Sequence, residues 1–149
     1  MKKLLVIVLF LASSIFESHA QNAEELAVKK VLNAYKASIE KLTTNGIVNL
    51  FTKDSEIIES GKIEGNIAAY LDHHLGPELK DFKSFTFSNY TIKVKIDGIY
   101  AFTTEDYVYT IVLKDAKEIK QKGIATSVLQ KTSEGWKIKS THSSARKTK

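Results

Sequence analysis

Long runs of alternating apolar and polar residues fill the second half of the chain and restrict its fold more than any other feature. In one run, Tyr90, Ile92, Val94 and Ile96 occupy every second position. A period of two is typical of β-strands with one buried face, because successive side chains point to opposite sides. We therefore predict four strands, over residues 84–96, 99–114, 117–132 and 136–146.

Three short turns join these strands and predict antiparallel pairing. Asp97-Gly98 is a strong signal for a two-residue hairpin. The residues at 115–116 and at 133–135, the latter including a glycine, separate the remaining strands. The four strands should therefore form an antiparallel meander.

In the first predicted strand, the apolar residues change from odd to even positions. Phe85 and Phe87 lie at odd positions, whereas the apolar series that begins at Tyr90 lies at even ones. One inserted residue reverses the faces of a strand, so we predict a bulge or bend near residues 88–89.

The first half of the chain predicts helices. Apolar residues at helical spacing indicate a helix over residues 22–42, followed by a short helix at 47–51. Residues 53–60 predict a short strand. Helices that precede a meander of long, curled strands predict an α+β fold, in which N-terminal helices pack on a strongly curved antiparallel sheet. This cone-shaped arrangement should enclose a cavity.

A second helix carries two adjacent histidines. Apolar residues within 65–75 follow a helical period that places His74 on the apolar face. Gly76 is suited to end this helix and Pro77 to begin another. Glu78 should then lie in the first turn of a second short helix, so that His74 and Glu78 are not an ordinary pair four residues apart.

The N-terminus has the pattern of an export signal. Two lysines precede an apolar run over residues 4–16, and small residues flank a cleavage site after Ala20. We predict that residues 1–20 are a signal peptide and that residues 21–149 form one domain, exported to the periplasm or secreted, with no membrane association after cleavage.

Composition excludes several classes of site. The sequence contains no cysteine, which excludes disulfides, a cysteine nucleophile and thiolate metal sites. The net charge of +5 is spread over predicted strands and the C-terminal tail, and no nucleic-acid-binding motif accompanies it. We therefore expect no nucleic-acid partner.

Three segments together resemble a known family. They are residues 27–58, residues 61–75 (GKIEGNIAAYLDHHL) and the ending EGWKIKSTHSSAR at 134–146. The chain resembles the nuclear transport factor 2-like superfamily and is most similar to its SnoaL-like branch. The resemblance implies the cystatin-like cone fold over residues 21–149 and a homodimer. It implies no particular activity, because members of the superfamily include isomerases, dehydratases, cyclases and proteins that only bind.

In the predicted strand at residues 99–114, odd and even positions lie on opposite faces, which indicates which side chains can point into the cavity. Tyr107 and Tyr109 share one face with Glu105, whereas Asp106 has the opposite parity, so only one of the two acids can point inward. Together with groups from other elements, the expected ligand-binding residues are Tyr70, His74, Tyr107, Tyr109, Trp136 and His142. For Trp136, packing in the core or at a dimer interface is the favoured alternative.

The first functional hypothesis is a binding module. Aromatic residues are abundant, and no recognisable nucleophile or catalytic pair accompanies them. Such a composition favours a pocket for a small apolar or amphipathic ligand, with a few polar side chains to orient it.

The second hypothesis is a site for zinc or copper. Imidazole and carboxylate groups suit these ions. The candidate ligands are His73, His74, Glu78 and His142.

The third hypothesis is a lyase or isomerase. His142 or His74 would act as a general base near an acid such as Glu105. Tyr107 or Tyr109 would donate a hydrogen bond to a developing oxyanion.

Overall fold

The computed structural model describes the backbone of residues 2–148 and the side chains of residues 21–148. The predicted signal peptide at residues 1–20 lies outside the residues whose side chains are described. Within the described part of the chain, no helix combines the length and apolar character needed to cross a membrane.

The predicted helices and strands are present, and the chain also contains elements that were not predicted. All four strands of the meander occur, as β3 to β6. The elements in chain order are α1 (Lys2–Glu40), η1 (Ile47–Leu50), β1 (Phe51–Glu59), β2 (Lys62–Gly65), α2 (Ile67–Tyr70), η2 (Leu71–Leu75), α3 (Gly76–Asp81), β3 (Phe82–Asp97), β4 (Tyr100–Leu113), β5 (Glu118–Thr132) and β6 (Gly135–Lys147).

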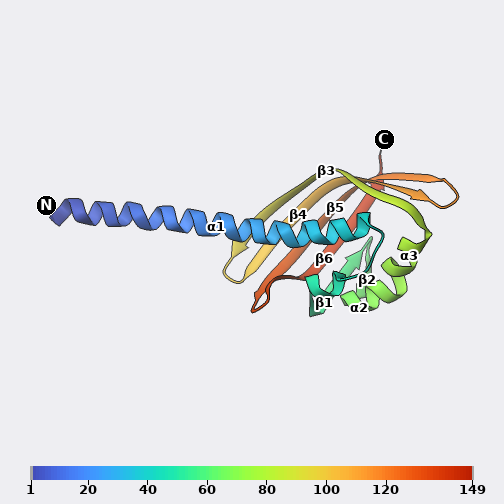
Figure 1. Ribbon diagram of the computed structural model, residues 1–149, viewed down its shortest axis with the longest axis horizontal. Helices are drawn as coiled ribbons and strands as arrows, with labels where there is room; N and C mark the ends of the chain where they lie inside the picture. Colours follow the sequence, from blue (N-terminus) through green and yellow to red (C-terminus); the bar gives the residue numbers. More distant parts are fainter. Residues whose placement is uncertain (1, 149) are drawn as a thin grey trace.

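The six strands form one open, curved sheet in the order β2-β1-β6-β5-β4-β3 (Figure 1). The strands from β3 to β6 pair antiparallel, as predicted. β1 runs parallel to β6, so the sheet is mixed, and the expectation of a purely antiparallel sheet is corrected. The parallel pair is possible because the helices and the meander lie between β1 and β6 in the chain and provide the long crossover that it needs.

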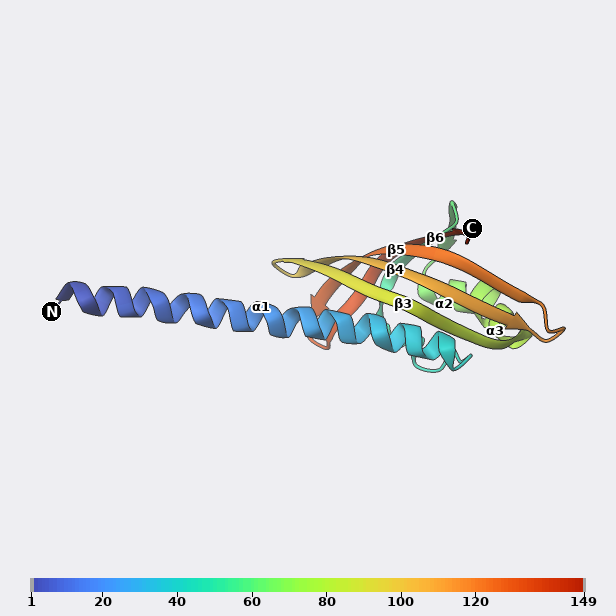
Figure 2. The same ribbon diagram turned by 90° about the horizontal axis from the view of Figure 1, so that it is seen from above.

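The C-terminal half of α1 lies over the concave face of the sheet, and α2 and α3 lie beside β1 and β2 (Figures 1 and 2). Val28 and Leu32 of α1 belong to the same buried core as Leu129 and Ile138 of the sheet, and each of the four is at most 1% exposed. The helix therefore closes the concave side of the curved sheet.

Bulges set the faces of the long strands. The predicted bulge in β3 is confirmed: the pairing with β4 slips between Ser88 and Thr91, and Asn89 has a φ of 52°. A second bulge lies in β6, where Leu129 pairs with Ile138 but its neighbour Val128 pairs with Ser140. Lys139 is thus an extra residue, and it reverses the faces of everything after it in β6.

The predicted helix end at Gly76 is wrong. The helix continues through a π turn, η2, in which the Gly76 N–H donates to the carbonyl of Leu71, five residues earlier. Gly76 has an ordinary right-handed φ of −64°, and a Cβ at this position would lie 2.2 Å from the Leu71 oxygen. Pro77 has no N–H to donate in the following turn, which a local widening of the helix tolerates. The glycine therefore provides space rather than a left-handed cap.

Candidate functional site

A cavity of about 380 Å³ lies between α1, the concave face of the sheet and the α2–α3 segment. Strands β3 and β4 supply most of its aromatic wall, and α1 adds one ring from above. The principal rings are Tyr35, Phe85, Phe87, Tyr90, Tyr107 and Tyr109.

The rings of the aromatic wall contact one another. The Phe85 ring is stacked on Tyr109 at 5.3 Å between centroids, and the Phe87 ring meets Tyr107 edge to face at 5.2 Å. The bulge at Asn89 brings Tyr90 to the same side as the two phenylalanines. Because each ring is supported by neighbours, the wall is a continuous and ordered surface.

Gly123 of β5 makes room for one of these rings. It pairs with Tyr107 across the sheet, and a Cβ on Gly123 would lie 2.3 Å from the Tyr107 ring. The absence of a side chain at this position therefore lets the Tyr107 ring lie against the sheet.

Glu105 is the buried acid of the cavity, as its parity predicted. It is 8% exposed and lines the cavity with Tyr107 and Tyr109, whereas Asp106 points outward and lies 3.2 Å from the Lys122 ammonium. The Tyr90 hydroxyl donates a short hydrogen bond to the Glu105 carboxylate. Burial raises the pKa of Glu105, and the hydrogen bond from Tyr90 opposes that rise.

A second carboxylate, Glu59 at the end of β1, also lines the cavity. The Tyr70 hydroxyl donates to Glu59 Oε2 at 2.6 Å. Burial, followed by the negative charge of Glu59, raises the pKa of Tyr109. Burial and then the charges of Glu59, Tyr107 and Glu105 likewise raise the pKa of Tyr35. The charges of Glu59 and Glu105 therefore both affect tyrosines of the same cavity.

Glu78 is the third carboxylate of the cavity wall, and its side chain is half exposed. Because the helix continues through the π turn, His74 and Glu78 do lie four residues apart on one continuous helix, contrary to prediction, with His74 Nε2 3.5 Å from Glu78 Oε1. Burial raises the pKa of Glu78, and the adjacent His74 opposes that rise.

The histidine pair belongs to a polar cluster beside the cavity. His73 Nε2 lies 2.7 Å from Glu64 Oε2, and the Glu64 side chain is only 2% exposed. Hydrogen bonds from His73 and then Lys62 lower the pKa of Glu64. The His74 ring stacks on Tyr70 at 5.2 Å and lies 3.5 Å from Glu59 Oε2. Neither histidine lines the cavity, so His74 reaches it only through the acids that do.

The expectation that His142 faces the cavity is wrong. His142 is exposed, and its neighbours Thr141 and Ser143 line the cavity instead. Thr141 accepts a hydrogen bond from Ser127 Oγ at 2.9 Å across the sheet. The cause is the extra residue Lys139, which reverses the faces of the strand after Ile138.

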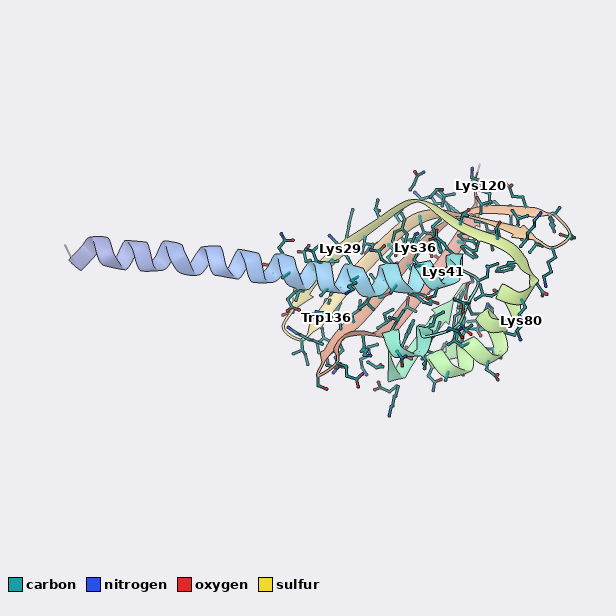
Figure 3. All side chains as sticks on the ribbon, viewed as in Figure 1. Lys29, Lys36, Lys41, Lys80, Lys120 and Trp136 are labelled. Atoms are coloured by element: carbon teal, nitrogen blue, oxygen red, sulfur yellow. The ribbon has the colours of Figure 1, made fainter. Side chains whose placement is uncertain are left out.

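Trp136 is not a cavity residue; it lies in the core, as the favoured alternative for this ring predicted. It is 6% exposed and packs in the core, where its Nε1 donates to Glu24 Oε2 of α1 at 2.6 Å. Figure 3 shows Trp136 at the opposite end of the sheet from Lys120, beside the β5–β6 turn. Its role is to close that end of the core.

The predicted metal site is not assembled. Among the residues whose side chains are described, no group of three or more histidines and acids is placed to hold a metal ion. His142 lies on the outer face, away from His73, His74 and Glu78, so the proposed zinc or copper ligands do not converge.

Sequence reasoning missed several residues of the cavity. Phe85, Phe87 and Tyr90 belong to the wall, and the predicted change of parity in β3 was a signal that could have placed them together. Tyr35 and Glu59 had no such signal, because their positions depend on how α1 and β1 pack. The arrangement can enclose an apolar ring, accept hydrogen bonds at the carboxylates of the wall and hold a proton at the buried Glu105.

Comparisons with known proteins agree with this architecture. Residues 28–147 match the family model described as a SnoaL-like domain. No curated protein sequence matches the chain.

Solved structures share the fold at low sequence identity. A nuclear transport factor 2-like superfamily protein from Salmonella enterica serovar Typhimurium is similar with a TM-score of 0.76 and 20% identity, covering 86% of this chain and 94% of that one. A nuclear transport factor 2-like protein with a cystatin-like fold from Novosphingobium aromaticivorans gives 0.69 and 12%, covering 87% and 86%. A hexachlorocyclohexane dehydrochlorinase gives 0.73 and 12%, covering 85% and 87%. At these identities the likeness concerns the fold alone.

Proposed function

The chain belongs to the SnoaL-like domain family of the nuclear transport factor 2-like superfamily, and we propose that it binds a small apolar or amphipathic molecule in its aromatic cavity. One observation carries this proposal: a cavity of about 380 Å³ lined by eight aromatic rings together with aliphatic side chains and a few acids and hydroxyls. Small-molecule sites have this character, being concave, mostly apolar and provided with a few polar groups.

The polar groups of the cavity suit a ligand with a defined orientation. Glu105 lies deep in the wall, and the hydroxyls of Ser127 and Thr141 lie on neighbouring strands. Each of these groups has one protein partner and can form further hydrogen bonds, which a wholly apolar ligand would leave unmade. The ligand should therefore carry at least one polar atom on an otherwise apolar body.

Filling the cavity tests the proposal. Ala125 is buried and lines the cavity, whereas its neighbour Thr126 points outward. We expect a thermal-shift screen of small aromatic compounds to find ligands that stabilise the wild-type chain. The substitution Ala125→Leu should abolish that stabilisation, and Thr126→Leu should leave it intact. A screen in which no compound stabilises the protein, or in which both variants respond alike, would contradict the proposal.

A lyase or isomerase is a second candidate, and the environment of Glu105 favours it. A buried carboxyl with a raised pKa, held by the Tyr90 hydroxyl, is suited to receive or donate a proton. Glu105 thus takes the role for which His74 and His142 were considered. One structural neighbour is named as a dehydrochlorinase, an enzyme of the elimination type.

Deuterium exchange tests this second candidate. We expect the protein in D2O to accelerate exchange at the α-carbon of small cyclic ketones, and Glu105→Gln to reduce the rate by about 100-fold or more. Asp106→Asn removes a carboxylate from the next position on the outer face and should have no effect. Exchange that is absent from the wild type, or that survives Glu105→Gln, would rule out this role for Glu105.

Homodimerisation through the outer face of the sheet is also proposed. Phe102 on β4 and Ile124 on β5 are 48% and 45% exposed, and both lie on the face away from the cavity. A second copy would cover these side chains. Light scattering should give the mass of a dimer, and Phe102→Asp should give a monomer; a monomeric wild type at high concentration would refute the proposal.

Export is proposed from the N-terminal pattern at residues 1–20 alone. Fractionation of cells that express the full chain should find a shortened protein beginning near Gln21 outside the cytoplasm. A full-length protein retained in the cytoplasm would contradict export.

A further inference from the structure

The charge inside the cavity is opposite to the charge of the whole chain. The chain carries a net charge of +5. The charged residues of the cavity wall are three acids, Glu59, Glu78 and Glu105, and one base, Lys36. Because acids line the cavity of a basic protein, the electrostatic potential in the cavity differs from the average potential over the surface.

Lys36 does not neutralise these acids. Its ammonium lies 2.7 Å from Glu40 Oε2, and Glu40 is held in place by the backbone N–H of Phe87, which donates to Oε1 at 3.0 Å. The Lys36–Glu40 pair therefore balances its own charge, and Lys36 forms no ion pair with an acid of the wall among the described side chains.

Glu105 stands apart from the other two acids. Glu59 and Glu78 each have His74 Nε2 at 3.5 Å. Among the residues with described side chains, no lysine, arginine or histidine nitrogen lies within 4.0 Å of the Glu105 carboxylate, although this side chain is buried. Its hydrogen bond comes from the neutral hydroxyl of Tyr90. Glu105 is thus a buried acid with room for a positive partner.

The aromatic wall already holds one cation. Lys36 Nζ lies 5.5 Å from the centroid of the Phe87 ring and 5.5 Å from that of Tyr90, which is within the range of cation–π attraction. The position of Lys36 on α1, directly over the sheet, is visible in Figure 3. The protein's own ammonium therefore shows that the faces of these rings are accessible to positive charge.

We propose that the ligand of this cavity is an organic cation, an aromatic or amphipathic amine or quaternary ammonium compound, whose positive nitrogen lies beside Glu105 among the tyrosine rings. The inference rests on the proposed binding function and specifies its ligand class. Aromatic faces and a carboxylate together attract an ammonium group more strongly than either does alone. The apolar body of the ligand would lie along Phe85, Phe87 and Tyr109.

A matched set of probes tests the ligand class. Benzyltrimethylammonium carries a fixed positive charge, neopentylbenzene replaces its nitrogen by carbon, and phenylacetate carries a negative charge. Titration calorimetry of the full chain should give an affinity for the cation at least about tenfold higher than for the neutral probe, and no measurable binding of the anion. Equal or tighter binding of the neutral probe would overturn the inference while leaving the binding function intact. If none of the three probes bound, both the inferred ligand class and the proposed binding of small molecules of this size would be overturned.

Two variants then assign the preference to Glu105. Glu105→Gln keeps the shape of the side chain and should reduce the affinity for the cation about tenfold, while changing that for neopentylbenzene by less than about twofold. Asp106→Asn removes the same charge from the outer face and should change neither. Retained binding of the neutral probe shows that the variant is folded. If the ratio of the affinities for the cation and the neutral probe were the same in Glu105→Gln as in the wild type, the role of Glu105 would be refuted. If that variant does not fold, the comparison of the probes on the wild-type chain still decides the ligand class.

Discussion

The two ends of the sheet are filled in different ways. Beside the β5–β6 turn, Val28, Ala101 and Leu129 are 0% exposed in the core, and Trp136 closes the end by its hydrogen bond to Glu24. Toward the other end, phenylalanine and tyrosine rings surround a cavity of about 380 Å³. The same helix and the same sheet therefore support both a solid core and a hollow one.

The difference lies in the tips of the side chains. Leucine and valine carry no polar atoms, so they interdigitate until the space is filled. Three tyrosines of the cavity are tied to acceptors at the wall: Tyr70 donates to Glu59, Tyr90 to Glu105, and Tyr109 to Gln121 at 2.7 Å. A ring that is fixed by its hydroxyl cannot turn inward to fill the centre. Anchored tyrosines thus keep the cavity open.

The largest effect should come from truncation in the solid end. Leu129→Ala should lower the free energy of unfolding by about 2–5 kcal/mol, because it leaves a void among fully buried neighbours. Ile119→Ala, on the same strand but at the half-buried edge of the cavity, should cost no more than about 1.5 kcal/mol. Urea denaturation measures both, and equal losses would mean that the two ends do not differ in packing.

A steric change under the aromatic wall should rank second. Gly123→Ala should lower the free energy of unfolding by about 1–3 kcal/mol, because the new methyl group overlaps the Tyr107 ring. The displaced ring should also weaken binding of aromatic ligands. In a double-mutant cycle, Tyr107→Ala should cost less in the Gly123→Ala background than in the wild type. Additive costs would show that the ring does not depend on the glycine.

Removing one anchor should have a moderate effect. Tyr109→Phe loses the hydrogen bond to Gln121 and should lower the free energy of unfolding by about 0.5–1.5 kcal/mol. If the hydroxyl holds the ring at the wall, ligand binding should weaken as well, since the freed ring can enter the cavity. Unchanged binding in the phenylalanine variant would show that ring packing alone keeps the cavity open.

The pH dependence of stability should reveal the cost of the buried acid. Because burial raises the pKa of Glu105 in the folded state, the folded protein holds this proton more tightly than the unfolded chain does. The resulting stabilisation is complete below the unfolded pKa of about 4.3 and is lost as pH rises through the folded value. Glu105→Gln does not titrate here, so its melting temperature relative to wild type should rise between about pH 4 and about pH 8. Glu78 is present in both proteins, so its contribution cancels in this comparison. A difference in melting temperature that does not change with pH would show that Glu105 is not a buried carboxyl with a raised pKa.

The smallest effect should come from the outer face of the same strand. Asp106 and Lys122 form an ion pair of 3.2 Å whose side chains are both 46% exposed. Asp106→Asn should change the free energy of unfolding by less than about 1 kcal/mol, because exposed pairs are screened by water and salt. A larger loss would indicate that this face is covered in solution.

Local rules were sufficient to predict most of the fold. The hairpin at Asp97-Gly98, the bulge at Asn89 and the inward direction of Glu105 each follow from a few neighbouring residues. The parallel pairing of β1 with β6 does not, since it joins segments that are far apart in the chain. The short strand β2 was missed because its four residues show too little alternation.

The site was harder to predict because two single-residue irregularities decide it. Gly76 serves equally well as a left-handed helix cap and as a place of close backbone approach, and the sequence favoured the first reading. The bulge at Lys139 lies inside a regular alternation that gives no local sign of it. The predicted direction of His142 depended on a regular strand at Lys139, and the predicted separation of His74 from Glu78 depended on a helix end at Gly76. The cavity is lined by carboxylates and by neither of these histidines.

The bulge in β6 also means that the character of the cavity rests on one position in the chain. Deleting Lys139 would remove the bulge without turning the strand: Ser140 would follow Ile138 directly and still pair with Val128, so Thr141 and Ser143 would keep facing the hollow. If Lys139 itself paired with Val128, every later residue would slip by one place and His142 would face the hollow instead. This one spacer residue thus decides whether the floor of the cavity carries neutral hydroxyls or a titratable ring.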